Sequence, residues 1–441
     1  MAPSEKRAVP RFWFVRAHQL QSFVTRERDI KCSAFTLLGG GHHGGRSATR
    51  GRGRSVKVLY TNFHTGAGVG GHTVYVLSLA RQFAGRHDVL VAAPAGSALL
   101  RLAGAMPGVR AFAQAFPNRP HLLATAARRL RELIVTQGVE LVHVNGSADH
   151  RLVMLATLGM GAKRPRIVFT KHNDIPVSPV SGWLRASFGT DHAIAVCDFA
   201  RRVLQASPYR RCPLATIPNG VDTEHFAPRA PEAVNDLRAR LLAHPQRRIL
   251  LGSNAGTDDY KGWMNMVEAV ARLPAALRDT VQIALAGAPL KDEQRARIEA
   301  LGMSDHVSWA GRLDDVRGFI AALDIGFVLS YRIETISFAC REMMAMGKPV
   351  VVSSHGGLPE NIIPNVDGWV VPERDAQRLA QLLEDLLPHP QRWRQAGAAA
   401  RLKCEQRFRI ERFAQATEQV YATALGTAPA EVPHTWGSVR P

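Results

Sequence analysis

The chain has 441 residues, of which 46% are hydrophobic, and this is enough for two hydrophobic cores of ordinary domain size. The formal net charge of +19 favours polyanionic partners, such as phosphorylated substrates, anionic membrane surfaces or nucleic acid. The five cysteines are widely spaced without a CxxC pair, which indicates reduced cytoplasmic thiols and argues against a disulfide framework or a zinc site. No apolar run reaches the roughly 20 residues that span a membrane, and the first residues lack a clean apolar core, so we expect neither a membrane span nor a secretory signal.

Residues 1–54 differ in composition from the rest of the chain. They contain eleven Lys or Arg against three acidic residues and end in a tract rich in Gly and Arg. This composition predicts a basic, low-complexity, disordered extension. One hypothesis is a dispensable leader, and another is a basic arm that binds anionic lipid. No aromatic stacking platform accompanies the tract, so nucleic acid is not an expected partner.

From residue 56, short apolar runs alternate with helical stretches. The first series predicts strands at 56–60, 88–92, 141–144, 167–170, 193–196 and 214–217, with helices at 71–83, 120–137, near 150–160 and at 198–206. After a turn-rich break at 218–222, the second series predicts strands at 249–253, 282–286, 307–309, 324–329 and 350–353. Helices are expected between these strands at 263–273, 292–301 and 314–323, and then at 374–388, 390–405 and 408–424.

This alternation predicts an α/β protein with two doubly wound, Rossmann-like domains. We place the first domain at 55–222 and the second at 223–405, followed by a C-terminal helix at 406–425 and a tail at 426–441. Ligands of such sheets bind at the carboxyl ends of the strands, so the predicted site is a cleft between the two domains.

A glycine-rich loop follows the first predicted strand. Gly66, Gly68 and Gly71 match the GxGxxG fingerprint of dinucleotide-binding domains. However, residues 61–65 separate the strand from the first glycine, and the second strand ends without an acid to hold a ribose hydroxyl. Three interpretations remain open: a flexible turn, a loop that closes on a phosphate or an acceptor, and an NAD site.

Two histidines, His143 and His172, end predicted strands on the face where ligands bind. A strand-end histidine is often structural, and no third ligand is spaced to hold a metal with them. His172 is also a candidate donor to a sugar hydroxyl or a phosphate oxygen.

Two glutamates, Glu334 and Glu342, flank the start of a helix that is expected to end at Gly347. Glu342 is expected about two turns into this helix. A helix N-terminus above a strand offers free N–H groups and a positive dipole end to a phosphate. Two acids beside it suggest recognition of hydroxyls, as in a nucleotide-sugar.

Lys261 opens the helix that follows the first strand of the second domain. A cation there can neutralise the charge that develops on a leaving diphosphate, whereas the alternative is a solvated surface lysine. Glu360, in the loop at 355–360, is expected either to lie over the cleft or to cap a helix.

Together these residues resemble the glycosyltransferases of family 4, which have the GT-B fold, over residues 56–425. Glu334 and Glu342 are similar to the family's Glu-x7-Glu signature, and residues 342–350 to the EAMAxGxPV-type end of its helix. Residues 217–222 resemble its IPNGVD hallmark, residues 355–362 its GG-x-PE loop, and residues 367–371 the segment after that loop. The resemblance also implies that the C-terminal helix packs back toward the first domain.

The resemblance implies a set of catalytic and donor-binding residues. The catalytic candidates are Glu334 at the donor sugar, Lys261 as the diphosphate clamp and His172 near the donor sugar. The donor-binding candidates are Gly70, Gly71, Asn254, Lys261, Ser337, Phe338 and Glu342, with Glu342 on the ribose and the Ser337 and Phe338 N–H groups on the diphosphate. One position departs from the family pattern, because Gly256 stands where an Arg is common, and Asn254 is a weak substitute.

The predicted function is transfer of a sugar from a nucleotide-sugar to a glycan or lipid-linked acceptor, in the synthesis of lipopolysaccharide or another surface polysaccharide. The resemblance implies retention of anomeric configuration without a metal or other cofactor. The net charge suits a cytoplasmic protein that binds peripherally to the cytoplasmic face of the inner membrane. The alternatives are a sugar-nucleotide epimerase, a non-catalytic donor-binding scaffold and an NAD-dependent oxidoreductase.

Overall fold

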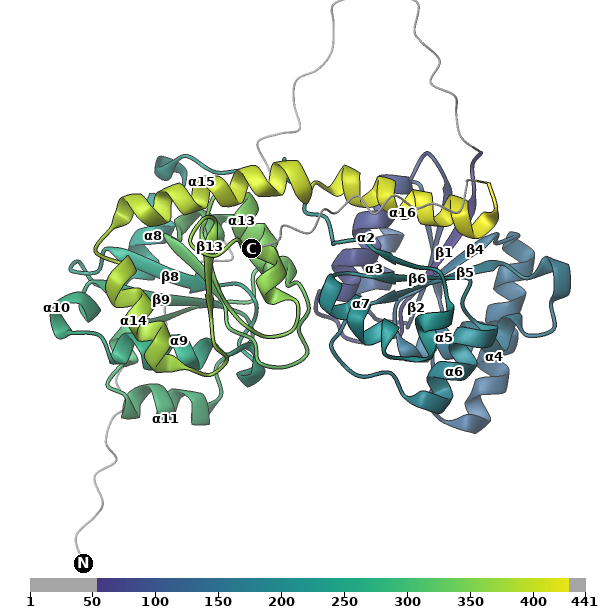
Figure 1. The fold of residues 1–441 in the computed structure, drawn as a ribbon, viewed down its shortest axis with the longest axis horizontal. Helices are drawn as coiled ribbons and strands as arrows, with labels where there is room; N and C mark the ends of the chain where they lie inside the picture. The colour runs from purple at the N-terminus through teal and green to yellow at the C-terminus, as the bar shows by residue number, and fades with distance from the viewer. Residues whose placement is uncertain (1–53, 428–441) are drawn as a thin grey trace, which may run out of the picture.

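The computed structural model describes residues 54–427 as two parallel sheets, each flanked by helices (Figure 1). The strand order is β3-β2-β1-β4-β5-β6-β7 in the first sheet and β10-β9-β8-β11-β12-β13 in the second. Both orders reverse direction once, which is the doubly wound arrangement, so the predicted fold class is confirmed. The predictions for residues 1–53 and 428–441 lie outside the described residues.

The first sheet carries its helices on both faces, so its strands are nearly continuous apolar runs. Its strands are β1 Lys57–Thr61, β2 Asp88–Ala93, β3 Val109–Ala113, β4 Leu141–Val144, β5 Arg166–Lys171, β6 His192–Ala195 and β7 Leu214–Thr216. Its helices are α2 Gly71–Phe83, α3 Ala98–Gly104, α4 Pro120–Gln137, α5 Ser147–Thr157, α6 Pro179–Phe188 and α7 Asp198–Gln205. Strand β3 and helices α3 and α6 were not predicted from the sequence. The edge strand β3 has no fully buried residue, which weakens its apolar pattern.

The second sheet is built in the same way. Its strands are β8 Ile249–Ser253, β9 Val281–Ala286, β10 Val307–Gly311, β11 Ile325–Val328, β12 Val350–Ser353 and β13 Gly368–Val371. Its helices are α8 Asn235–Leu242, α9 Trp263–Ala271, α10 Ala275–Arg278, α11 Asp292–Ala300, α12 Arg317–Ala322, α13 Phe338–Ala345, α14 Ala376–Leu386 and α15 Pro390–Arg407. Short or polar elements, such as α8 and α10, were not predicted.

Helix α13 begins later than the sequence analysis implied. Ile333 and Ser337 have positive φ angles of 52° and 28°, so the segment before Phe338 is not helical. Glu342 therefore lies about one turn into α13, and the expectation of about two turns was wrong. The expected end is confirmed, because Gly347 has a φ of 73° and its N–H donates to the carbonyl of Met344.

The last helix, α16 Ile410–Leu425, continues from α15 along one side of the molecule and lies over the first sheet (Figure 1). It packs on α2 and β5. The Tyr421 hydroxyl is 2.6 Å from Nδ1 of His143, and Nε2 of His143 is 2.6 Å from the Thr170 hydroxyl. His143 is thus fully buried beneath α16, and its expected position on the ligand-binding face was wrong.

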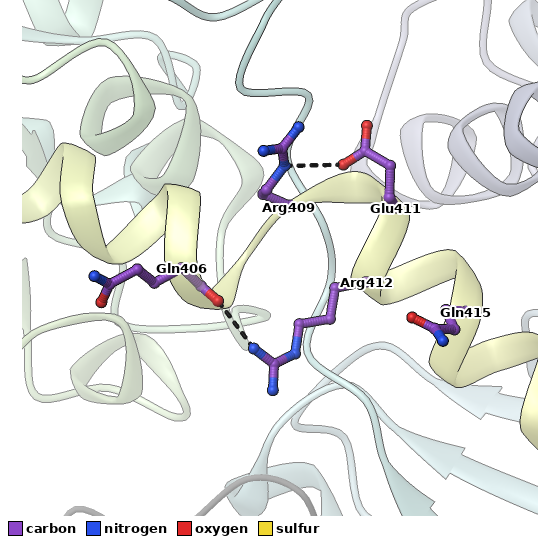
Figure 2. A pocket seen from close by; sticks show the side chains of 5 residues that line it. All are labelled: Gln406, Arg409, Glu411, Arg412 and Gln415. Carbon is purple, nitrogen blue, oxygen red and sulfur yellow. Dashed lines mark hydrogen bonds and ion pairs between the residues drawn. The ribbon is translucent and has the colours of Figure 1, made fainter.

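The chain passes between the sheets at two adjacent places. The N–H of Val221 donates to the carbonyl of Phe408 at 2.7 Å, so the link from β7 lies beside the junction of α15 and α16. A hollow of about 540 Å³ lies at this junction. Figure 2 shows the polar side chains that line it: Gln406, Arg409, Glu411, Arg412 and Gln415. The hollow belongs to the connection between the sheets, and none of the predicted site residues lines it.

Candidate functional site

The predicted site residues follow the strands at which each sheet reverses its order. In the second sheet, β8 and β11 are neighbours at this switch point, with Lys261 after β8 and Glu334 after β11. In the first sheet, β1 and β4 are neighbours there, with the glycine loop after β1 and Asn145 after β4. Doubly wound sheets bind their ligands at such points, so the topology locates the site between the two sheets.

Lys261 and Glu334 form a buried ion pair. The distance between Nζ of Lys261 and Oε2 of Glu334 is 2.8 Å, and their side chains are 16% and 11% exposed. The Ser330 hydroxyl donates to the same carboxylate oxygen at 3.2 Å. Burial lowers the pKa of Lys261, but the charge and hydrogen bond of Glu334 outweigh it, so the net shift of this pKa is upward. Lys261 is therefore a fixed cation and not a solvated surface lysine.

Gly262 fixes the position of Lys261. Its φ is +70°, and a Cβ atom there would lie 1.9 Å from the carbonyl oxygen of Leu329. A residue without a Cβ is required because the backbone turns directly against the end of β11.

We expect Gly262→Ala to lower the free energy of unfolding by about 2–4 kcal/mol through backbone strain and overlap. The matched control is Gly66→Ala, because a Cβ at Gly66 meets no atom within 4 Å. The control should change stability by about 0.5 kcal/mol or less. Urea denaturation of both variants checks this, and equal midpoints would contradict the structural role of Gly262.

Glu342 and Asn254 face each other across the same site. Nδ2 of Asn254 donates to Oε2 of Glu342 at 2.7 Å. Burial raises the pKa of Glu342 to about 7, and the hydrogen bond from Asn254 only partly opposes this shift. Oδ1 of Asn254 is buried without a partner among the described residues. The pair therefore offers a carboxylate and an unsatisfied amide oxygen to the hydroxyls of a ligand.

The N-terminus of α13 lies against the glycine loop. The N–H groups of Ser337 and Phe338 have no backbone acceptor among the described residues. A Cβ at Gly71 would lie 3.6 Å from Cδ2 of Phe338, and Gly70 is the N-cap residue of α2. The first turn of α13 can therefore bind an anion with the glycine loop directly beside it.

His172 lies beside this site and is held from the first sheet. Its Nε2 is 2.9 Å from Oδ1 of Asn145, and its carbonyl accepts a hydrogen bond from the Thr335 hydroxyl at 2.8 Å. Burial, and then the neighbouring His72 and His143, lower the pKa of His172 well below its usual value. Nδ2 of Asn145 donates to two carbonyls, so its Oδ1 accepts from Nε2 of His172. A neutral His172 thus keeps Nδ1 as an acceptor, which favours accepting a hydrogen bond from a sugar hydroxyl over donating one.

The sequence analysis missed several residues that join the two sheets. Asp174 accepts from the N–H of Ile333 at 3.1 Å, and its Oδ2 is 3.0 Å from Nε2 of His355. Arg341 is fully buried and donates to the carbonyl of Asn219 and, at 3.0 Å, to Asn361. Spacing along the sequence gives no signal for the pairs of Asp174 or for Arg341 with Asn219, because these partners are more than a hundred residues apart.

Glu360 is a helix cap, which was one of its two expected roles. Its two carboxylate oxygens accept the N–H groups of Asp198 and Phe199 at 2.7 Å each, at the start of α7. The capped helix belongs to the first sheet, so the cap also links the two sheets.

The segment with Gly256 differs from the family pattern in a way that the structure explains. Gly256 has a φ of +100°, which an Arg would adopt only with strain. The backbone is also crowded here, because a Cβ at Gly287 would lie 3.0 Å from the Cα of Gly256. The carboxylate of Asp259 accepts from Gln294 at 2.6 Å and lies 3.5 Å from Nζ of Lys291. The negative charge of Asp259 is therefore balanced locally.

Three further observations concern the described part of the chain. Across residues 54–427, no group of three or more His, Cys, Asp or Glu side chains is arranged to hold a metal ion. No helix in the same part of the chain has both the length and the apolar composition for a membrane span. The described cysteines, Cys197, Cys212, Cys340 and Cys404, are free.

Comparison with known proteins agrees with this geometry. A model described as Glycosyltransferase Family 4 matches residues 69–225, and a model described as Glycosyl transferases group 1 matches residues 228–403. The two doubly wound sheets have the GT-B fold, and both matched models describe glycosyltransferases. The chain belongs to the glycosyltransferases of family 4.

Individual relatives have low sequence identity. One relative is a GDP-mannose-dependent monoacylated alpha-(1-6)-phosphatidylinositol monomannoside mannosyltransferase of Corynebacterium glutamicum. The chain is 30% identical to it over 198 residues, and these cover 43% of this chain and 51% of that protein. A second relative is the GDP-mannose-dependent alpha-(1-6)-phosphatidylinositol monomannoside mannosyltransferase of Mycobacterium tuberculosis. The chain is 27% identical to it over 288 residues, and these cover 62% of this chain and 73% of that protein.

A solved structure shares the fold. Anabaena HepE in complex with UDP has a TM-score of 0.70 and 20% identity over 83% of this chain and 100% of that chain. None of these comparisons supports the epimerase, scaffold or oxidoreductase hypotheses.

Proposed function

We propose that this glycosyltransferase moves a sugar from a nucleoside diphosphate sugar to a lipid-linked or glycan acceptor in the synthesis of a surface glycan. One observation carries the proposal: the Lys261–Glu334 ion pair, Glu342 and the free N–H groups of α13 lie together at the switch point of the second sheet. This set offers a cation and N–H donors to a diphosphate and two carboxylates to hydroxyls.

In the proposed mechanism the diphosphate lies at the N-terminus of α13, and Lys261 neutralises the charge that develops as it leaves. The carboxylate of Glu342 accepts hydrogen bonds from the ribose hydroxyls, and that of Glu334 accepts one from a hydroxyl of the donor sugar. The glycine loop and His172 belong to the acceptor side of the site and lie next to the donor sugar. Because Glu334 is held by Lys261, we favour attack by the acceptor on the same face as the leaving diphosphate, which retains configuration without a metal. Catalysis then consists of positioning and of stabilising the leaving group.

The relatives bear on the acceptor and the location. Both mannosyltransferases named above are described as acting on a phosphatidylinositol monomannoside, which is a lipid. The net charge of +19 suits an enzyme that works at an anionic lipid surface. We therefore propose a peripheral position on the cytoplasmic face of the membrane and a lipid-linked acceptor, with lipopolysaccharide or a related glycan as the product.

A thermal-shift screen of GDP-mannose, UDP-glucose, an ADP-sugar and a CMP-sugar tests the donor class. We expect one nucleoside diphosphate sugar to raise Tm by several degrees at a concentration about a hundredfold above its Kd. Transfer of that sugar to a membrane extract then tests the reaction. A chain that binds none of these donors, or that responds only to NAD, would contradict the proposal.

A further inference from the structure

Helix α6 has its polar and apolar sides reversed. Its buried residues are Gly182, Arg185 and Ala186. Its large apolar residues face outward, with exposed fractions of 74% for Val180, 43% for Trp183, 38% for Leu184 and 49% for Phe188. The rings of Trp183 and Phe188 are in edge contact at 5.8 Å. Soluble proteins rarely expose so continuous an apolar surface unless it binds a partner.

The helix cannot rotate to bury these side chains. A Cβ at Gly182 would lie 2.5 Å from Cγ1 of Val177, so the inward side of α6 is tightly packed. Arg185 is fixed on that side, where its Nε donates to the Tyr209 hydroxyl at 3.3 Å. The outward side chains Val180, Trp183, Leu184 and Phe188, called the α6 face from here on, therefore stay in solvent unless a partner covers them.

The elements that contact α6 carry cations. The short helix η3, Pro208–Arg211, packs on α6 and carries the exposed Arg210 and Arg211. At the C-terminal end of α6, Arg164 donates to the carbonyl of Phe188 at 3.5 Å. Residues 150–216 contain ten Lys or Arg against Asp174, Asp191 and Asp198. Asp191 is paired with Arg164 and Arg166, and Asp174 with His355, and the segment that carries α6 has a positive net charge.

We propose that the α6 face inserts into an anionic lipid surface, with Arg210 and Arg211 on the phosphates. An exposed Trp and Phe on a helix lying flat, with cations beside them, is the composition that binds at a membrane interface. A second copy of the chain is a less suitable partner for the α6 face, because two positively charged surfaces would meet. The chain's own residues 1–54 are also basic, with eleven Lys or Arg against three acids, and would be repelled.

The position of α6 connects this surface to the reaction. The helix begins seven residues after His172, and it lies with α4 and α5 on the outer side of the first sheet (Figure 1). Because α6 follows β5 through the loop that contains His172, the N-terminal end of α6 lies toward the edge of the first sheet at which the candidate site is found. This inference rests on the proposed lipid-linked acceptor, but vesicle binding can be measured without any transfer reaction.

Co-flotation of the full chain with phosphatidylcholine vesicles, with or without phosphatidylglycerol, tests the proposal. We expect binding only to the vesicles with phosphatidylglycerol. The double variant Trp183→Glu/Phe188→Glu should weaken binding at least roughly tenfold. Arg210→Gln and Arg211→Gln should each weaken it about fivefold, and less so at high salt. The matched control Leu402→Glu alters a residue that is 53% exposed on α15, and it should bind like the wild type.

Donor-induced thermal shifts should be the same in all these variants, because α6 touches no donor residue. This separates failure of the lipid surface from failure of the proposed donor site. The proposal is overturned if the wild-type chain does not float, or if the double variant floats as well as Leu402→Glu. It is also overturned if light scattering shows a dimer that the double variant converts to a monomer, because the α6 face would then bind a second copy.

Discussion

Lys261→Ala is expected to lower kcat by about 10²–10³-fold with little loss of donor binding, because one preorganised donor to a developing charge has about that effect. The side chain is a fixed cation with its Nζ 2.8 Å from Glu334, and Gly262 holds its backbone. Initial rates of transfer at saturating donor measure the change. Lys291→Ala is the matched control, because Lys291 is 60% exposed and lies 3.5 Å from Asp259.

A structural role for Lys261 must be separated from a chemical one. Its removal leaves Glu334, which is 11% exposed, without its cation. The double variant Lys261→Ala/Glu334→Gln removes this unpaired charge. The reference is Glu334→Gln alone, because Glu334 itself is proposed to hold the donor sugar. If Lys261 only neutralises Glu334, the double variant is as active as Glu334→Gln, and the assignment to the diphosphate fails. If Lys261 stabilises the leaving group, the double variant is about 10²–10³-fold slower than Glu334→Gln, while circular dichroism shows all variants folded.

Glu342→Gln is expected to weaken binding of the nucleotide-sugar roughly 30- to 100-fold, because charge-assisted hydrogen bonds to two hydroxyls are lost. The amide keeps the size of the side chain, so packing of α13 is retained. Isothermal titration with the donor measures the effect. Glu384→Gln, on the exposed side of α14, is the control and should bind the donor normally. Wild-type affinity in Glu342→Gln would exclude Glu342 from the donor site.

The pKa of Glu342 predicts a pH dependence that the same variant should abolish. Burial raises this pKa to about 7, so the carboxylate that accepts hydroxyls is mostly ionised at pH 8 and mostly protonated at pH 6. Donor affinity of the wild type should therefore fall about tenfold from pH 8 to pH 6, and that of Glu342→Gln should not change. The nucleotide-sugar itself does not titrate in this range, so it is a suitable probe.

The contribution of Glu342 to the stability of the free enzyme should decrease as the pH rises, whereas its contribution to donor affinity should increase. The folded state holds the Glu342 proton up to about pH 7, whereas the unfolded chain releases it near its ordinary value of 4.5. The unfolded state binds fewer protons in this window, so the contribution of Glu342 to stability falls as pH rises from about 4.5 to 7. A donor that binds the carboxylate form offsets this loss. Urea denaturation at pH 5 and pH 7 measures the change relative to Glu342→Gln.

The fold class could be predicted because strand and helix periodicity is local. Buried parallel strands such as β11 and β12 are apolar at nearly every position, and the helix ending at Gly347 has the required glycine. Elements whose burial is decided by neighbours were missed. The strand β3 lies at a sheet edge, and α6 has its apolar residues outside, so neither shows the usual pattern.

The sequence by itself determined the candidate residues of the site, because Glu334, Glu342 and Lys261 lie in segments whose spacing and glycines are local features. Only the tertiary structure decided their relations: the ion pair of Lys261 with Glu334, the contact of Asn254 with Glu342, and the burial of His143 beneath α16. These partners are separated by 73, 88 and 278 residues in the sequence, and no local pattern fixes the distance between such side chains. Burial also sets the pKa of Glu342, and it is a property of the packed chain rather than of the residue type.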